Sequence, residues 1–324
     1  MRVIRGLPPA GRRGGSQGAV TIGVFDGVHR GHEAILRATL ARARRLDGRA
    51  VVMTFDRHPL AVLAPSAAPR CLMTLAQRLE RFRELGFDTA VVLPFTRALA
   101  RRSATDFVRT VLMGRLRAAD VVVGYDFHFG HGGAGDAALL ARLGAVHGFS
   151  VTVVPPALDH GEPISSTRIR RLIRLGKFAE ACRLLGRPPR LAGIRVNGRR
   201  LGRRIGFPTI NFLPRNECLP PHGIYAAWLR PAGARRPAGI RSGGPVRLPA
   251  VAYLGSRPTV DREGARTQLE VHCLRKVPVI AAGAGAEIEL IAYQRPDRKF
   301  TGLEPLRRQI VRDAARARKI LAIR

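Results

Sequence analysis

The chain has 324 residues, enough for two domains that each bury a core. It contains no apolar run long enough to span a bilayer, and its basic, glycine-rich start carries no secretory signal, so we expect a cytoplasmic protein without membrane attachment. Its four cysteines form no C-x-x-C pair, which argues against a disulfide framework and a structural zinc site, while the formal net charge of +33 makes polyanion binding a class to consider.

Apolar β-type segments alternate with helical ones in the first half of the chain. We expect strands near residues 20–25, 50–55, 89–94, 120–124 and 150–154. We expect helices near residues 33–46, 74–85, 103–112 and 137–147, with Ser103 as the N-cap of the third. This alternation predicts an α/β domain with a parallel sheet and helices on both faces, whose ligands bind at the carboxyl ends of the strands.

The pattern changes in the second half. After two short helices at 167–175 and 178–185, the run Arg187-Pro188-Pro189 breaks the alternation, so we place the domains at 1–186 and 187–324. Short β segments follow, at 191–196, 223–229, 248–254, 268–274 and 286–293. They predict a small antiparallel β-barrel with a terminal helix over 302–321, and the stretch 235–247 reads as a loop between two strands.

The run Gly23-Val24-Phe25-Asp26-Gly27-Val28-His29-Arg30-Gly31-His32 lies between the first strand and the first helix. Its glycines let the backbone turn tightly and approach a ligand. A turn that opens a helix offers N–H groups and the positive end of the helix dipole, which suit phosphate oxygens. His29 and His32 can add hydrogen bonds to such a phosphate. The alternative is a plain turn with two exposed histidines.

Further runs also follow a strand or open a helix. They are Thr54 to Pro59, Gly124 to Gly130, Gly135-Asp136, and Ile164 to Arg170. In the last run, Ser165 or Ser166 can cap a helix whose N-terminus, together with Arg168, faces a polyphosphate. A plain capped helix with a solvated arginine is the alternative.

Together these runs resemble the bacterial bifunctional riboflavin kinase/FMN adenylyltransferases, also called FAD synthetases, over residues 20–317. The resemblance implies a nucleotidyltransferase-type first domain that adenylylates FMN to FAD, with His29 and His32 on the α-phosphate of ATP and Arg168 on the leaving pyrophosphate. Because the attacking FMN phosphate is already an anion, positioning and charge neutralisation suffice without a general base. The implied ATP and FMN contacts of this domain are Gly23, Phe25, Asp26, Gly31, His58, Pro59, Asp126, Phe127, Asp136, Ser165, Ser166 and Thr167.

The second domain carries a glycine-rich run that ends in Pro208-Thr209-Ile210-Asn211 and resembles the riboflavin kinase signature. Thr209 and Asn211 offer two oxygens on one side of an extended segment, which suit a Mg²⁺ ion shared with ATP phosphates; a strand that leaves a turn is the alternative. Phosphorylation of a ribityl hydroxyl calls for a base, and Glu270 matches the catalytic glutamate of the family, although a solvated strand carboxylate has the same pattern. The implied phosphate and flavin contacts are Gly198, Gly202, Gly206 and Arg295.

The match to the family changes between residues 274 and 285. Leu274-Arg275-Lys276-Val277 and Ala281 to Gly285 stand where the family has an aspartate-phenylalanine pair and a leucine-tyrosine-glycine run, whereas 254–259 and 295–300 fit it. One alternative is therefore an FMN adenylyltransferase with an impaired kinase domain.

An alternative of another class is an arginine-rich nucleic-acid-binding protein. Its arginines are dispersed and only 6% of the residues are aromatic, so we expect no specific nucleic-acid partner. The expected partners are the small molecules ATP, riboflavin and FMN, and no pattern indicates an oligomeric state.

Overall fold

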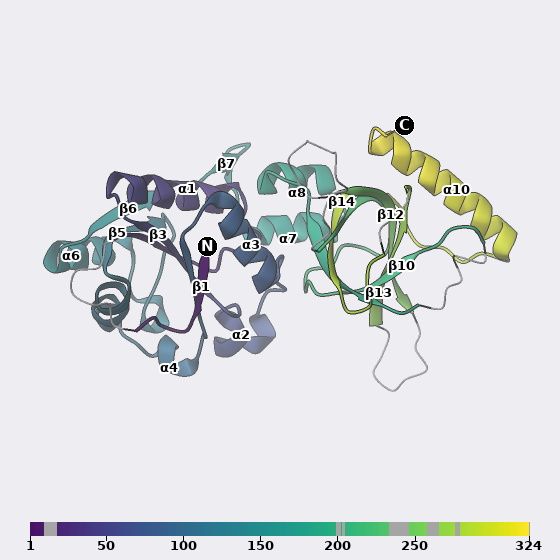
Figure 1. Ribbon diagram of the computed structural model, residues 1–324. Helices are drawn as coiled ribbons and strands as arrows, with labels where there is room; N and C mark the ends of the chain where they lie inside the picture. The colour runs from purple at the N-terminus through teal and green to yellow at the C-terminus, as the bar shows by residue number, and fades with distance from the viewer. Residues whose placement is uncertain are drawn as a thin grey trace. The chain divides into compact units, whose positions relative to one another are not determined.

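The computed structural model describes residues 1–9, 18–198, 202, 205–232, 246–257, 266–275 and 279–323. The chain forms two compact units, Met1–Cys71 with Leu75–Ser166, and Leu72–Thr74 with Thr167–Arg324 (Figure 1). Compactness assigns α8 (Phe178–Leu185) and all but the first residue of α7 (Ser166–Arg174) to the second unit. The boundary between the two activities, at residues 186 and 187, stays a prediction.

The first unit is built on a six-stranded parallel sheet with the strand order β1-β4-β3-β2-β5-β6. Its strands are β1 (Arg2–Arg5), β2 (Gly18–Ile22), β3 (Arg49–Phe55), β4 (Thr89–Leu93), β5 (Ala118–Gly124) and β6 (Ser150–Val154). The central strands are buried almost throughout, as near-continuous apolar runs covered on both faces should be. β1 was not expected in the basic start of the chain, and it is an edge strand paired with β4.

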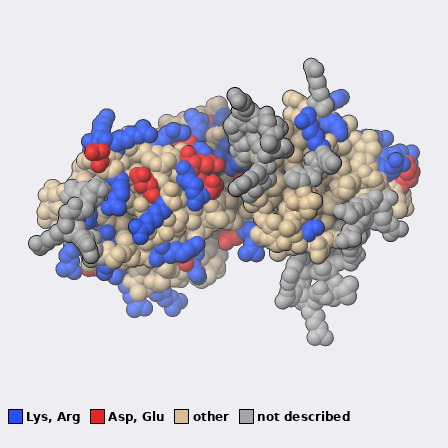
Figure 2. Space-filling view, in the orientation of Figure 1, with Lys and Arg blue, Asp and Glu red and all other residues tan. Residues whose placement is uncertain are grey.

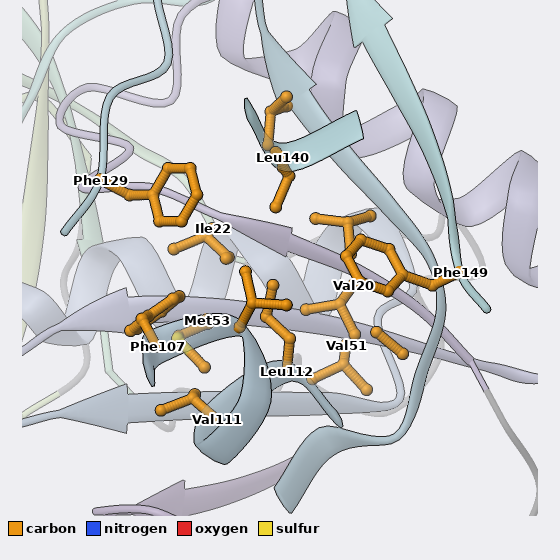
Figure 3. Close-up of a cluster of buried hydrophobic side chains, with 14 of the residues drawn as sticks. Val20, Ile22, Val51, Met53, Phe107, Val111, Leu112, Phe129, Leu140 and Phe149 are labelled. Atoms are coloured by element: carbon orange, nitrogen blue, oxygen red, sulfur yellow. The ribbon is translucent and has the colours of Figure 1, made fainter. Parts of the chain in front are cut away.

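Helices cover both faces of this sheet. They are α1 (Arg30–Arg45), α2 (Leu60–Leu63), the 3₁₀ turn η1 (Pro65–Ala67), α3 (Leu75–Leu85), α4 (Arg97–Ala100), α5 (Ala104–Phe107), the π-helical η2 (Val108–Leu116), the 3₁₀ turn η3 (His131–Gly133) and α6 (Ala137–His147). On one face, Val20 and Ile22 of β2 pack against Phe107 and Leu112 of α5 and η2 (Figure 3). The alternate residues of β2 face the other way, where α1 packs on β2, β3 and β5.

The predicted elements of this unit differ from the observed ones mainly at their ends. The first strand ends at Ile22 rather than at residue 25, because the chain turns at Phe25 and Val28, whose φ angles are +51° and +39°. Ser103 caps α5 as expected, its Oγ accepting from the Asp106 N–H at 3.1 Å. The helix expected to end at residue 112 continues as η2 to Leu116. A short hairpin of β7 (Leu158–Asp159) and β8 (Glu162–Pro163) precedes α7.

The second unit contains a closed antiparallel barrel with the strand order β10-β13-β12-β11-β14-β9. Its strands are β9 (Arg190–Val196), β10 (Ile210–Pro214), β11 (Gly223–Pro231), β12 (Leu248–Arg257), β13 (Arg266–Cys273) and β14 (Gly285–Arg295). Phe212, Leu254 and Leu269 are fully buried in the barrel core. β10 was not among the predicted strands, because the signature that runs into it was interpreted as a glycine-rich loop followed by an extended segment that binds a metal.

The terminal helix α10 (Leu303–Ile320) packs on β11, β12 and β14. Ala317 and Leu321 meet Ile224 and Val251 there, which agrees with the narrow apolar stripe in the sequence. Among the described residues, no helix is both long and apolar enough to cross a membrane. Figure 2 shows Lys and Arg side chains spread over the visible surface rather than gathered in one patch.

Several features singled out in the sequence fall outside the described residues. They are Arg199 to Leu201, Arg203-Arg204, residues 235–245 of the predicted loop, Pro258-Thr259 and Lys276-Val277.

Candidate active sites

The turn that follows β2 is shaped from within by Phe25. Its ring folds back over Gly23, where a Cβ atom would lie only 2.9 Å from the ring Cζ. The ring is 3% exposed and makes edge contacts with His32 and with Phe82 of α3, at centroid distances of 5.4 and 5.8 Å. Gly23 is therefore needed for a close approach, and Phe25 contributes to the site by fixing the turn.

His29 caps the N-terminus of α1. Its Nδ1 accepts a hydrogen bond from the backbone N–H of His32 at 3.2 Å, so in the neutral ring the proton is on Nε2, which can donate to an anion. The rings of His29 and His32 stack at 3.6 Å and 18°, and Gly31 allows this because a Cβ there would lie 3.2 Å from the His29 ring. His29 is 5% exposed, which excludes the plain turn with two exposed histidines. Two imidazoles at the positive end of a helix form a suitable phosphate site.

Ser166 holds the same turn from α7. Its Oγ donates to the backbone carbonyl of Asp26 at 2.8 Å, and Asp26 is 3% exposed. Ser166 thus has a structural contact of its own, and Ser165 precedes it. Thr167 and Arg168 follow in the first turn of α7, within the second unit.

Two arginines of α3 that the sequence analysis did not single out also contact this region. The Arg78 guanidinium donates to the Val24 carbonyl at 2.7 Å, the Thr54 hydroxyl at 2.9 Å and the Phe55 carbonyl at 3.0 Å. Burial lowers the pKa of Arg78 below its usual value, against the opposing charge of Asp26.

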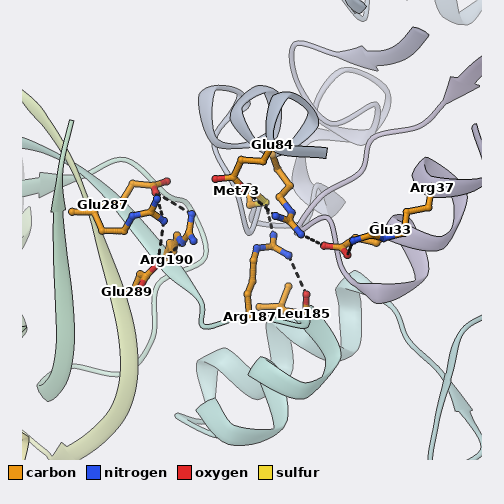
Figure 4. A network of polar contacts seen from close by, with 11 residues as sticks. Glu33, Arg37, Met73, Glu84, Leu185, Arg187, Arg190, Glu287 and Glu289 are labelled. Carbon is orange, nitrogen blue, oxygen red and sulfur yellow. Dashed lines mark hydrogen bonds and ion pairs between the residues drawn. The ribbon is translucent and has the colours of Figure 1, made fainter. Parts of the chain in front are cut away.

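Arg81, one turn further along α3, forms an ion pair with Glu33 in the first turn of α1. Arg81 also pairs with Glu84, and Glu33 pairs with Arg37, which completes this group of charges (Figure 4). α3 therefore contacts the chain on both sides of the two histidines, at Val24 before them and at Glu33 after them.

The remaining predicted residues of this unit follow β3 and β5, the neighbours of β2 in the sheet. Their carboxyl ends meet at the same edge as the histidine turn, because the strands are parallel. After β3, Nδ1 of His58 accepts from the Leu60 N–H at 3.2 Å, and Pro59 precedes α2.

The predicted residues after β5 include an aromatic and two carboxylates. Phe127 stacks on Phe129 at 5.4 Å, and Asp126 is exposed. Asp136 caps α6, accepting the Leu139 N–H at 2.7 Å, and this hydrogen bond lowers the pKa of its carboxyl group. Its side chain thus has a capping contact beside any contact with a ligand.

In the barrel, Asn211 and Glu270 are direct cross-strand partners, as are Glu270 and Tyr253. Side chains of such partners share one face of the sheet. Phe212 and Leu269, the next pair, point into the core, so Asn211 and Glu270 lie side by side on the outer face of the barrel. The structure thus brings together the predicted metal ligand and the predicted base.

Two described glycines of the signature lie close to the predicted metal ligands. A Cβ on Gly198 would lie 2.1 Å from Nδ2 of Asn211, and one on Gly202 would lie 2.2 Å from the Phe207 carbonyl and 3.3 Å from Oγ1 of Thr209. The Phe207 N–H donates back to the Gly202 carbonyl at 2.7 Å. Gly206 turns with a φ of +84°, which side-chain-bearing residues rarely adopt. Gly198 and Gly202 therefore allow close approaches to Asn211 and to Phe207 with Thr209.

Two further side chains of β13 hold this arrangement, and the sequence analysis missed both. Nε2 of Gln268 donates to Oδ1 of Asn211 at 2.7 Å. Nδ1 of His272 contacts the Pro208 carbonyl at 2.9 Å and must carry the hydrogen, since a carbonyl only accepts. Their spacing at every second residue from Glu270 was the available signal.

The oxygens of this site suit a hard cation. The side-chain carbonyl of Asn211 accepts a hydrogen bond from Gln268 and keeps a second lone pair for a metal ion. The hydroxyl oxygen of Thr209 is the second protein ligand, so the pair fits Mg²⁺ with ATP phosphates as further ligands. Arg295 is engaged elsewhere: its Nε and Nη2 donate to the carboxylate of Asp313 on α10, at 3.0 and 2.7 Å. This ion pair ties the helix to the barrel, and a ligand contact of Arg295 stays a prediction.

The halves of the chain match two family models, described as FAD synthetase over residues 13–168 and riboflavin kinase over residues 185–321. The bifunctional riboflavin kinase/FMN adenylyltransferase of Escherichia coli strain K12 is 36% identical over 323 residues, which cover 100% of this chain and 99% of that one. The chain belongs to this bifunctional family.

Other members of the bifunctional family are similarly close. The Pseudomonas fluorescens relative is 34% identical and covers 99% of this chain and 98% of its own. A crystal structure described as a macrolide-efflux protein from Streptococcus pneumoniae has a TM-score of 0.83 at 27% identity, covering 98% of this chain and 99% of that one. This likeness agrees with the α/β unit and the barrel. The family and fold expected from the sequence are confirmed, and these comparisons give no support to the impaired kinase or the nucleic-acid-binding protein.

Proposed function

We propose that the barrel phosphorylates riboflavin with ATP to give FMN, and that the α/β unit adenylylates FMN with a second ATP to give FAD. The observation that carries the second activity is the stacked pair of His29 and His32 at the N-terminus of α1. The first activity is supported by the cross-strand pairing of Asn211 and Glu270 and by the close approach of Gly198 to Asn211. Membership of the bifunctional family supports both.

In adenylyl transfer, a phosphate oxygen of FMN forms a bond to the α-phosphorus of ATP while the bond to the β-phosphate oxygen breaks and pyrophosphate leaves. The nucleophile is an anion, so no proton has to be removed. His29 donates from Nε2 to the α-phosphate and His32 stacks beside it, so that both stabilise the charge that develops in the transition state. The dipole of α1 adds to the same effect.

The other residues of this domain receive binding roles in the proposal. Ser165, Thr167 and Arg168 bind the far phosphates, and Arg168 neutralises the departing pyrophosphate. Phe127 and Pro59 contribute apolar surface for the flavin and adenine rings. The polar groups that line the same ligands are His58, Asp126 and Asp136.

In the kinase reaction, a ribityl oxygen of riboflavin attacks the γ-phosphorus of ATP, the bond to the β-phosphate oxygen breaks, and ADP leaves. Glu270 accepts the hydroxyl proton as general base. Gly198, Gly202 and Gly206 bind the phosphates through backbone N–H groups. Thr209 and Asn211 hold Mg²⁺, which neutralises the phosphate charge when bound.

The remaining proposals concern place and partners. The boundary between the activities lies near residue 187. This is supported by the family models, because the FAD synthetase match ends at residue 168 and the riboflavin kinase match begins at residue 185. None of the four cysteines, all of them described, forms a disulfide, which agrees with a reducing compartment, and we place the protein in the cytoplasm without a specific nucleic-acid partner.

Incubation of the purified chain with riboflavin, ATP and Mg²⁺, followed by chromatography of the flavins, tests both activities. We expect FMN first and FAD after it. A chain that makes FAD from supplied FMN but no FMN from riboflavin would lack the kinase activity. A chain that forms neither product while duplex DNA binds it with a steep salt dependence would support the nucleic-acid-binding alternative.

A further inference from the structure

A buried arginine lies directly behind the histidine turn. Arg78 of α3 is 4% exposed, and all three groups to which it donates are neutral: the carbonyls of Val24 and Phe55 and the hydroxyl of Thr54. These acceptors are at the carboxyl ends of β2 and β3. Burial of this arginine costs free energy in desolvation, which the charges of Asp26 and Asp56 offset only in part, so apolar packing alone does not account for it.

The groups that Arg78 holds belong to the most constrained part of the site. Phe25 has a φ of +51°, in the region that favours glycine, and its neighbours on both sides are anchored by their carbonyls. Arg78 binds the carbonyl of Val24, and Ser166 binds that of Asp26. A turn in such a conformation persists only where its surroundings fix it.

The turn leads directly into the phosphate site. The Phe25 ring contacts His32 on one side and Phe82 of α3 on the other, and His32 stacks on His29. A displaced Val24 would move Phe25, and with it the surface against which the two imidazoles stack. Thr54 reinforces the link, because its hydroxyl donates to the same Val24 carbonyl at 3.2 Å.

We propose that Arg78 is a positioning residue for adenylyl transfer: by binding Val24, Thr54 and Phe55 it holds the strained turn that presents His29 and His32 to the α-phosphate. It touches no reacting atom. The inference rests on the proposed adenylyltransferase activity. It predicts that Arg78 acts on the rate of the chemical step more than on ATP binding, because misplacement of the donors by about 1 Å costs on the order of 100-fold in rate.

The test compares Arg78→Met and Arg78→Lys with the parental chain in steady-state FAD formation from FMN. Arg83→Met is the matched control, since Arg83 is on the same helix but half-exposed and paired with Glu80. Arg78→Met should lower kcat by about 100-fold with a much smaller change in KM for ATP. Arg78→Lys, which keeps a cation and some of the donors, should recover part of kcat. Arg83→Met should behave as the parent.

Riboflavin phosphorylation by the same molecules separates positioning from general damage. It should stay at the parental rate in both Arg78 variants. If Arg78→Met fails to fold, Arg78→Lys decides, and parental kcat in a folded Arg78→Lys would overturn the proposal. Equal loss of both activities in a folded variant would overturn it too, as would parental kcat in Arg78→Met. A parental chain that forms no FAD would refute the proposed function instead.

Discussion

Replacement of His29 by asparagine and by alanine separates its two roles. Asparagine is among the best N-cap residues, so its amide oxygen can replace Nδ1 in accepting the His32 N–H, but it lacks the imidazole Nε2–H. Alanine loses both. Loss of the cap should cost about 1 kcal/mol of the free energy of unfolding, or roughly 2–4 °C in Tm for a unit of this size. Loss of one donor to the transition state should lower kcat by about 100-fold to 1,000-fold.

We therefore expect His29→Asn to keep the parental Tm and His29→Ala to lose a few degrees, while both lose most FAD formation. Chromatographic rates of FAD formation from FMN, with thermal unfolding followed in parallel, measure the two effects. FMN formation from riboflavin is the internal control and should not change. If His29→Asn formed FAD at the parental rate while only His29→Ala lost stability, His29 would be a helix cap and no phosphate ligand.

Three further predictions concern the barrel. Glu270→Gln should abolish FMN formation from riboflavin and leave FAD formation from FMN unchanged; a variant that still phosphorylates riboflavin at the parental rate would remove Glu270 as the base. Gly198→Ala should impair riboflavin phosphorylation alone, because the added Cβ would lie 2.1 Å from the Asn211 amide nitrogen. Parental kinase kinetics in this variant would show that the backbone at residue 198 can move away from Asn211 without loss of activity. Burial raises the pKa of the Cys273 thiol to about 12, so at pH 7.5 it should be protonated and react with maleimide only after unfolding. Rapid labelling of Cys273 in the folded protein, read by mass spectrometry, would contradict the last prediction.

The sequence predicts the central sheet well because strands buried on both faces leave a clear pattern. Three consecutive valines, Val121 to Val123, predict a strand that is covered on both faces, and β5 is buried at these residues. β1 was not predicted because a short edge strand, in which two aliphatic residues stand between two arginines, resembles a basic tail. β10 was missed for another reason. Its first residues belong to a signature whose glycines and proline indicate a turn, and only the pairing of Asn211 with Glu270 reveals the strand.

The residues of the candidate site could be proposed from the sequence, but the contacts that hold them could not. The two histidines were visible from their spacing, whereas the tautomer of His29 follows only from its bond to the His32 N–H. The position of Arg78 could have been noticed in the sequence, because it falls on the apolar stripe of α3 with Leu75, Leu79 and Phe82. An arginine on a stripe that faces the core is not a solvated side chain. Two of its three acceptors come from β3 and the third from the turn that follows β2, and no local pattern specifies them.

Complementation between two variants tests most directly the claim that two separate sites act in sequence. His29→Asn alone should convert riboflavin to FMN and stop, and Glu270→Gln alone should leave riboflavin unchanged. A mixture of the two, given riboflavin, ATP and Mg²⁺, should accumulate FAD. Loss of FMN formation in folded His29→Asn, or conversion of riboflavin by Glu270→Gln at the parental rate, would contradict the account.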